Sequence, residues 1–283
     1  MKSKNKSKNL SERMKRYEFV ERKYLTPKIP IIIRLDGKAF HTFCRGMKKP
    51  YDEIMMNSMV ETTKYLCENI QGVKLAYTQS DEITLVLYDH NPKSDGWFEY
   101  NLQKMVSVSA SMATLAFNKA FEKFVKEYPL CNNDLTLGGI VNEDDETLYR
   151  TRMFEKIDKA LFDSRAFSIP KYEVVNCLIW RQQDATRNSI QSTGRVYFSQ
   201  KQLNGKSCNE IQDILFKEKG INWNDFPIAF KRGICIVKQD YYIKNDKDED
   251  VKRTKWEADY TIPIFTQDRD YIENKLIDEV EEK

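Results

Sequence analysis

Carboxylates follow two apolar runs of the chain. Asp36 comes directly after Ile29–Leu35 ("IPIIIRL"), and Asp81 and Glu82 follow "LAYTQS" and precede the second half of another apolar stretch. Two carboxylates held close together repel each other unless a cation lies between them. Hard oxygen ligands suit Mg²⁺, whose coordination is usually completed by water and substrate phosphates. If the two runs pair as strands, the sequence predicts a metal-dependent site for phosphoryl transfer.

The residues after Asp36 support this chemistry. Gly37 has no side chain, so its own carbonyl or a phosphate can come close. Arg45, Lys48 and Lys49 precede a predicted helix, and cations beside a helix N-terminus suit a triphosphate. Simpler interpretations are a common Asp-Gly turn, acids at a hairpin tip that face water, and a basic surface loop. A lone histidine such as His41 is more often structural.

The periodicity predicts the elements that position these residues. We expect a strand over Ile29–Leu35, a helix over 52–70, a hairpin of Val73–Tyr77 and Ile83–Tyr88 with acids at its tip, a helix from Trp97 to about Phe124, a strand over 165–170, and a helix over 171–192 that ends near Gly194. This order indicates an α+β fold: an antiparallel, ferredoxin-like sheet with helices on one face and a smaller mixed C-terminal region. Segments 131–146 and 245–254 are expected to be loops.

The stretch "LIWRQQDATRNSIQ" (178–191) is rich in Arg, Gln, Asp and Asn for a helix. With Trp180 anchored in the core, Arg181, Arg187 and Asn188 are candidates for multidentate contacts with a polynucleotide backbone. A polar helix that faces solvent explains the same pattern equally well.

Composition excludes several classes of function. The net charge of the 283 residues is only +3, although residues 1–16 hold seven basic residues against Glu12. The chain has only two histidines, and its cysteines are widely spaced without a Cys-x-x-Cys pair. This pattern argues against a zinc cluster and against a Ser–His or Cys–His triad. The cysteine spacing indicates mostly buried free thiols in a reducing cytoplasm. No apolar run indicates a secretory signal or a membrane span. We expect a basic, flexible arm (1–15), a catalytic core (16–145), and a region (146–283) that completes the core and contacts RNA.

Four ordered segments together carry a family resemblance. "RLDGKAFHTF", "YTQSDE", "FDSRAF" and "WRQQDATRNS" resemble the tRNA-His guanylyltransferase superfamily, in particular its guanylyltransferase-like branch of bacteria, phages and archaea. The resemblance runs from about Met14 to Cys235. It implies a catalytic domain like the palm of conventional polymerases, with a two-metal site, in an enzyme that adds nucleotides in the 3′-to-5′ direction.

The resemblance also implies roles for residues. Asp36, the Gly37 carbonyl and Asp81 would bind two Mg²⁺ ions, and Glu82 would support catalysis. The nucleotide-binding set would comprise Asp36, Gly37, Lys38, Ala39, Phe40, His41, Lys49, Ser80 and Asp81. Family members commonly assemble as tetramers, so a homotetramer is implied as well.

The implied reaction has two stages. ATP adenylylates the 5′ end of a tRNA with release of pyrophosphate, and the 3′-hydroxyl of an incoming GTP or other nucleoside triphosphate then attacks that end and displaces AMP. The eukaryotic branch carries His-Ile-Asn-Asn after "WRQ", where this chain has Ala185-Thr186-Arg187-Asn188-Ser189. This departure favours template-dependent repair of 5′-truncated tRNAs, with G addition to tRNA-His as a side activity. The alternatives are a strict tRNA-His guanylyltransferase, a palm-fold nucleotide cyclase that needs no RNA, and a non-catalytic RNA-binding protein.

Overall fold

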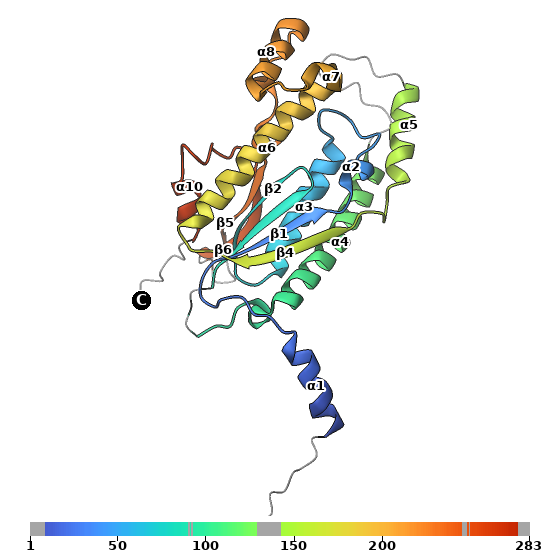
Figure 1. Cartoon of the computed structure of the whole chain (residues 1–283). Coiled ribbons are helices and arrows are strands. Elements are labelled where there is room, and N and C mark those ends of the chain that lie inside the picture. The colour runs from blue at the N-terminus through green and yellow to red at the C-terminus, as the bar shows by residue number, and fades with distance from the viewer. Residues whose placement is uncertain are drawn as a thin grey trace, which may run out of the picture.

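An antiparallel sheet forms the centre of the molecule (Figure 1). The computed structural model describes residues 9–89, 91, 93–128, 143–244, 248 and 250–276. Within these residues, six strands have the order β4-β1-β3-β2-β5-β6, and each strand is antiparallel to its neighbours. The strands are β1 (Ile31–Gly37), β2 (Val73–Gln79), β3 (Glu82–Leu87), β4 (Phe162–Ser168), β5 (Ile234–Lys244) and β6 (Asp250–Asp259).

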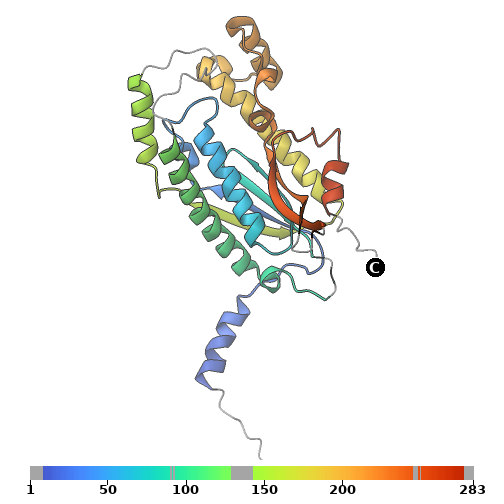
Figure 2. The same ribbon diagram turned by 180° about the vertical axis from the view of Figure 1, so that it is seen from behind.

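Helices cover both faces of the sheet, as the opposite views in Figures 1 and 2 show. Ile31, Ile33 and Leu35 of β1 belong to the core under α3 (Glu53–Asn69) and α4 (Leu102–Glu127). Ile32 points the other way, into a second core under α6 (Glu173–Tyr197). The predicted antiparallel sheet with helices is confirmed. The sequence predicts helices on one face of the sheet only, whereas the structure has helices on both faces. The central strands are apolar on both sides, so their second face also needs a cover.

The boundaries differ from the sequence prediction where the site lies. β1 continues through Asp36 and Gly37, and the β2–β3 turn is reduced to Ser80 and Asp81. Helix α6 does not end near Gly194 but continues to Tyr197. Gly194 allows close packing instead, since a Cβ there would lie 2.9 Å from Cγ2 of Ile211 on α8 (Cys208–Lys219).

The remaining elements extend from this central body. They are α1 (Leu10–Val20), α2 (Phe40–Phe43), α5 (Glu143–Phe154), α7 (Gln200–Leu203), α8 (Cys208–Lys219), α9 (Ile228–Arg232), α10 (Asp270–Glu273) and the short 3₁₀ turns Trp97–Tyr100, Trp223–Asp225 and Asn274–Leu276. Helix α1 has no buried residue and projects from the body (Figure 1). The described part of the predicted flexible arm is thus helical from Leu10. A third core cluster joins α6 to α8 through Ile190, Ile211 and Trp223.

Other predictions fall partly outside the described residues. Residues 1–8, His90, Cys131 and most of the predicted loop 131–146 lie there, while α5 already begins at Glu143. Residues 250–254 of the predicted charged loop form the start of β6. The five described cysteines are free, although only Cys67 and Cys235 are fully buried. Within the described chain, no helix has the length and apolar character needed to cross a bilayer. The domain boundaries and the cytoplasmic location stay predictions.

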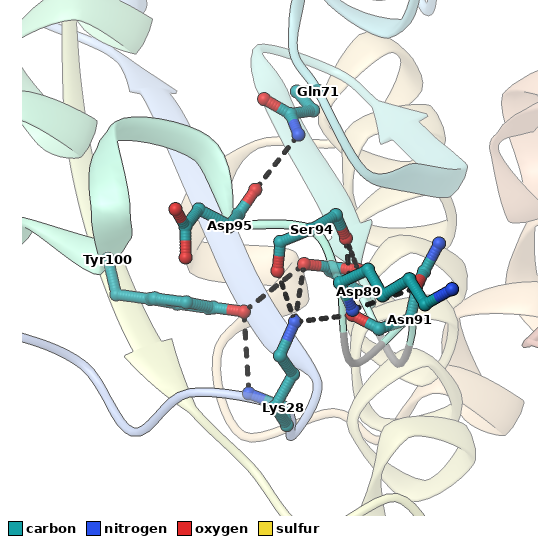
Figure 3. Close-up of polar contacts among 8 residues, drawn as sticks. Lys28, Gln71, Asp89, Asn91, Ser94, Asp95 and Tyr100 are labelled. Carbon is teal, nitrogen blue, oxygen red and sulfur yellow. Dashed lines mark hydrogen bonds and ion pairs between the residues drawn. The ribbon is translucent and has the colours of Figure 1, made fainter.

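A polar cluster ties the loop before β1 to the loop after β3 (Figure 3). The Lys28 ammonium donates to Asp89 Oδ2 at 3.1 Å and to the carbonyl of Asn91 at 2.6 Å, while Ser94 Oγ donates to Asp89 Oδ1 at 2.6 Å. The cluster closes the end of the sheet opposite to Asp36, because β1 begins and β3 ends there.

Candidate active site

The register of the sheet brings the acidic residues of the two apolar runs together. Asp36 of β1 is the direct partner of Glu82 on β3. The Gly37 N–H donates to the carbonyl of Asp81 at 3.0 Å, which fastens the end of β1 to the β2–β3 turn. Ser80 has a φ of +51° in this tight turn, and its Oγ donates to Asp81 Oδ1 at 3.0 Å. The expected convergence of the two runs is therefore present.

The electrostatics of the two aspartates reflect this arrangement. Burial raises the pKa of Asp81, and the negative charge of Asp36 raises it further. Burial also raises the pKa of Asp36, and the negative charge of Asp163 raises it further. The positive charges of Arg165 and Arg34 lower this pKa in part. Each carboxylate is therefore harder to ionise than a solvated aspartate, and a bound cation would relieve the repulsion.

The loop after β1 is shaped by close packing at Gly37. A Cβ at this position would lie 2.3 Å from Cδ2 of Phe40, so no larger residue fits without moving that ring. Phe40 is buried and packs on Phe117 and Phe162, with ring centroids 5.4 and 5.1 Å away. In the predicted nucleotide-binding loop, the side chain of Phe40 is buried, so only its backbone could contact a nucleotide. Lys38 and His41 of the same loop are exposed.

Glu82 is held by α6. Arg181 Nε and Nη2 donate to the two carboxylate oxygens of Glu82 at 2.6 and 2.9 Å, and both side chains are buried. Burial raises the pKa of Glu82, while the Arg181 charge counteracts the shift. Arg181 also donates to Asp184 at 2.9 Å. This buried, bidentate pairing does not favour a direct contact of Arg181 with RNA.

The other two predicted RNA-contacting residues remain at the surface of α6. Arg187 and Asn188 are exposed, and both donate to Asp184. The expectation that Trp180 is anchored in the core is wrong, because the residue is 51% exposed. Its ring instead lies against Arg34 and Arg181, with guanidinium carbons 5.4 and 4.4 Å from the ring centroid. Cation–π contact explains this exposed position.

The basic residues before α3 have different roles. Lys48 pairs with Glu146 at 3.1 Å and lies 4.9 Å from the centroid of the Tyr149 ring, so it fastens α5 to the body. Lys49 and Arg45 are exposed, and neither forms an ion pair with a described residue. Of the three cations, these two remain available for a phosphate.

A comparison of the chain with models of protein families identifies its family. A family model described as tRNAHis guanylyltransferase (Thg1) matches residues 11–170, more than half of the chain. The chain belongs to the tRNAHis guanylyltransferase family. The predicted family, the palm-like fold class and the prediction of a nucleotidyltransferase are confirmed.

Individual members of the tRNAHis guanylyltransferase family match over most of their length. A bacterial tRNA(His) guanylyltransferase-like protein in complex with ATP is 39% identical, with a TM-score of 0.77, over 95% of this chain and 99% of its own. A bacterial protein of the same description in complex with GTP is 37% identical, with a TM-score of 0.71, over 94% and 98%. The tRNA(His) guanylyltransferase of Saccharomyces cerevisiae is 27% identical over 78% of this chain and 88% of its own.

The residues present fit the Mg²⁺ ions that the resemblance implies. Among the described residues, no group of three or more His, Cys, Asp or Glu side chains has metal-binding geometry. Asp36 and Asp81 with a backbone carbonyl would instead offer an oxygen-only donor set, which would leave coordination positions for water and phosphate. Gly37 itself adds no side chain beside these oxygens, and the Phe40 ring packed against it leaves no room for one.

Sequence reasoning missed Asp163. It lies on β4 as the direct register partner of Asp36, on the side of β1 opposite to Glu82. The segment "FDSRAF" belongs to the family resemblance, but the sequence indicates no role for its acid because the pairing of β4 with β1 cannot be read from local pattern. Asp163 pairs with Arg165 at 3.1 Å and is exposed.

Proposed function

We propose that the chain is a template-dependent 3′-to-5′ nucleotidyltransferase that repairs 5′-truncated tRNAs. It activates the tRNA 5′ end with ATP and adds GTP or other nucleotides to that end, with G addition to tRNA-His as a side activity. The observation that carries the proposal is the bond from Gly37 to the Asp81 carbonyl, which holds two aspartates from remote segments at one end of the sheet.

The site residues take distinct roles in this proposal. Asp36, Asp81 and the Gly37 carbonyl hold two Mg²⁺ ions, with Glu82 supporting the site. Mg²⁺, when bound, stabilises negative charge on the transferring phosphate and makes a hydroxyl more acidic. Residues 38–41 and Ser80 place the nucleotide, and exposed Lys49 attracts its triphosphate.

The helix α6 contributes in two ways. Arg181 fixes the Glu82 carboxylate opposite Asp36 and so acts as a positioning residue. Arg187 and Asn188, on the exposed side of the same helix, contact the RNA.

Templated repair is preferred over strict recognition of tRNA-His for two reasons. The His-Ile-Asn-Asn stretch of the eukaryotic branch is replaced by residues 185–189 of this chain. In the comparison with solved structures, the identity to the bacterial guanylyltransferase-like protein, 39%, also exceeds the 24% found with the yeast enzyme. A homotetramer in the cytoplasm is part of the same proposal.

The test offers tRNAs that lack their first nucleotide, each with one of the four nucleoside triphosphates and ATP. We expect products that follow the base opposite the gap. Addition of G whatever the opposing base would establish a strict guanylyltransferase instead, and a cyclic nucleotide formed without RNA would establish a cyclase.

Variants test the metal assignment in the same assay. Asp36→Ala and Asp81→Ala are expected to abolish extension while tRNA binding persists. Asp213→Ala, which removes an exposed acid from α8, serves as the matched control. Extension at the wild-type rate by the Asp36→Ala/Asp81→Ala protein would refute the assignment.

A further inference from the structure

A basic cleft of about 700 Å³ lies beside the proposed nucleotide loop. One wall is the segment 38–46, which includes α2, and the other is the end of α5 with the turn that follows it; Figure 1 shows these two elements at the same end of the sheet. Five lining residues are basic: Lys38, Arg45, Arg152, Lys156 and Lys159. Glu155 is the one acidic residue among those that line it in the described chain.

The five cations are not paired with acidic residues in the part of the chain that the structure describes. None of their side chains forms an ion pair or hydrogen bond with a residue in the described ranges, in contrast to Lys48 and Arg181. Lys156 is half-buried. Burial lowers its pKa, and the charges of Lys159 and Arg152 lower it further, with Cys44 and Glu155 opposing. Mutually repelling cations of this kind are stabilised when an anion binds among them.

The second wall is held in a defined position. Tyr149 OH of α5 donates to Asp52 Oδ2 at 2.7 Å, and Asp52 in turn caps α3 by accepting from the Met55 N–H. The aliphatic stem of Arg152 lies over Gly46, where a Cβ would be 3.0 Å from Arg152 Cδ. Both walls are thus fixed before a ligand arrives, which lowers the entropy cost of binding.

The cleft adjoins the proposed metal site. Lys38 and Ala39, which line it, follow Gly37 directly, so an anion in the cleft lies beside the place where a 5′ end must react. The cations are spread over two walls of an open cleft, and the described residues that line it include no Asn or Gln side chain to read a base edge. Such a surface suits a row of backbone phosphates without sequence preference.

We propose that this cleft binds backbone phosphates of the RNA strand whose 5′ end is extended. The inference rests on the proposed function, and it adds Arg152, Lys156 and Lys159 to the RNA-contacting residues. These three lie outside every segment that carried the family resemblance. A free nucleoside triphosphate is the competing source of phosphate, and the experiment separates the two.

The test compares the wild-type protein with Arg152→Gln/Lys156→Gln/Lys159→Gln. A 5′-truncated tRNA is titrated at several salt concentrations, and ATP with Mg²⁺ is titrated separately. Each phosphate contact contributes about 0.7–0.9 to the slope of log K against log salt, so we expect the slope to fall by about 2 to 3 and tRNA affinity to drop at least tenfold. ATP affinity and Tm should stay at the wild-type values.

Two control proteins sharpen the result. Lys201→Gln/Lys206→Gln/Lys217→Gln removes the same charge from exposed positions around α7 and α8, and should leave the salt slope unchanged. Arg152→Lys/Lys156→Arg/Lys159→Arg keeps the charge and should retain binding. Wild-type tRNA affinity and slope in the Gln variant would overturn the proposal, as would a loss of ATP affinity alone.

The wild-type extension assay keeps this inference separate from the proposed function. If the wild-type protein extends truncated tRNA while the Gln variant binds tRNA normally, only the cleft assignment fails. If the wild-type protein extends no RNA, the proposed function fails regardless of the cleft variant.

Discussion

Arg181 and Glu82 form a buried bidentate ion pair, with nitrogen–oxygen distances of 2.6 and 2.9 Å. The pair joins α6 to β3 at the strand position opposite Asp36. It therefore couples the packing of a helix on the sheet to the placement of the acidic residues at the candidate site.

Arg181→Met is expected to lower the free energy of unfolding by about 3–5 kcal/mol, because Glu82 is left buried without its counter-charge. Adding Glu82→Gln should recover much of this loss, since neither side chain is then charged. Urea unfolding measures both effects. Arg187→Met, on the exposed side of α6, is the control and should stay within about 0.5 kcal/mol of wild type. Equal losses for Arg181→Met and Arg187→Met would contradict a structural ion pair.

Asp81→Asn is expected to stabilise the metal-free protein, on the order of 1 kcal/mol, because it removes repulsion between Asp81 and Asp36 at a functional site. The same variant should lose the rise in Tm that Mg²⁺ gives the wild-type protein. Thermal unfolding with and without Mg²⁺ measures both. Asp213→Asn, at an exposed position of α8, should change neither quantity. A Mg²⁺-dependent rise in Tm that survives Asp81→Asn would argue against the metal site.

Gly37→Ala is expected to destabilise the fold by about 1–3 kcal/mol, because the new Cβ would lie 2.3 Å from the Phe40 ring and force it to move. Extension activity should fall with it, since the same loop carries the nucleotide-binding residues. Ala39→Gly provides a contrast two residues away. Ala39 has a φ of +56°, which glycine adopts freely, so this variant should remain within about 1 kcal/mol of wild type. Chemical denaturation of the two proteins checks the difference.

Asp89→Asn is expected to reduce stability at neutral pH but not in strong acid. Asp89 is partly desolvated, but hydrogen bonds from Ser94 and Lys28 and the Lys28 charge lower its pKa below 3.8. A lowered carboxyl pKa contributes stability above the unfolded value, and this contribution is lost as the pH falls through the folded value. The difference between wild type and Asp89→Asn should therefore be constant above about pH 5 and vanish in the acid range below 3.8. Urea unfolding across this range measures it, and a difference independent of pH would exclude the ionised carboxylate as its cause.

The sequence by itself determined the local elements and the family, and it predicted the chemistry of the site. Apolar runs with turn residues predicted β1, the β2–β3 hairpin and α3 to within a few residues, because these signals depend on neighbours along the chain. Two acids at the ends of adjacent strands indicated a metal-dependent phosphoryl-transfer site, and four short segments indicated the family.

Only the tertiary structure decided which partners each side chain has. The register of β4 against β1 placed Asp163 beside Asp36, and the packing of α6 buried Arg181 on Glu82 while leaving Trp180 exposed. The docking of α5 through Tyr149 on Asp52 brought two basic segments together as a cleft. Strand pairing and helix docking join residues that are remote in sequence. Local patterns of polarity cannot specify such contacts, because they depend on how whole elements pack against one another.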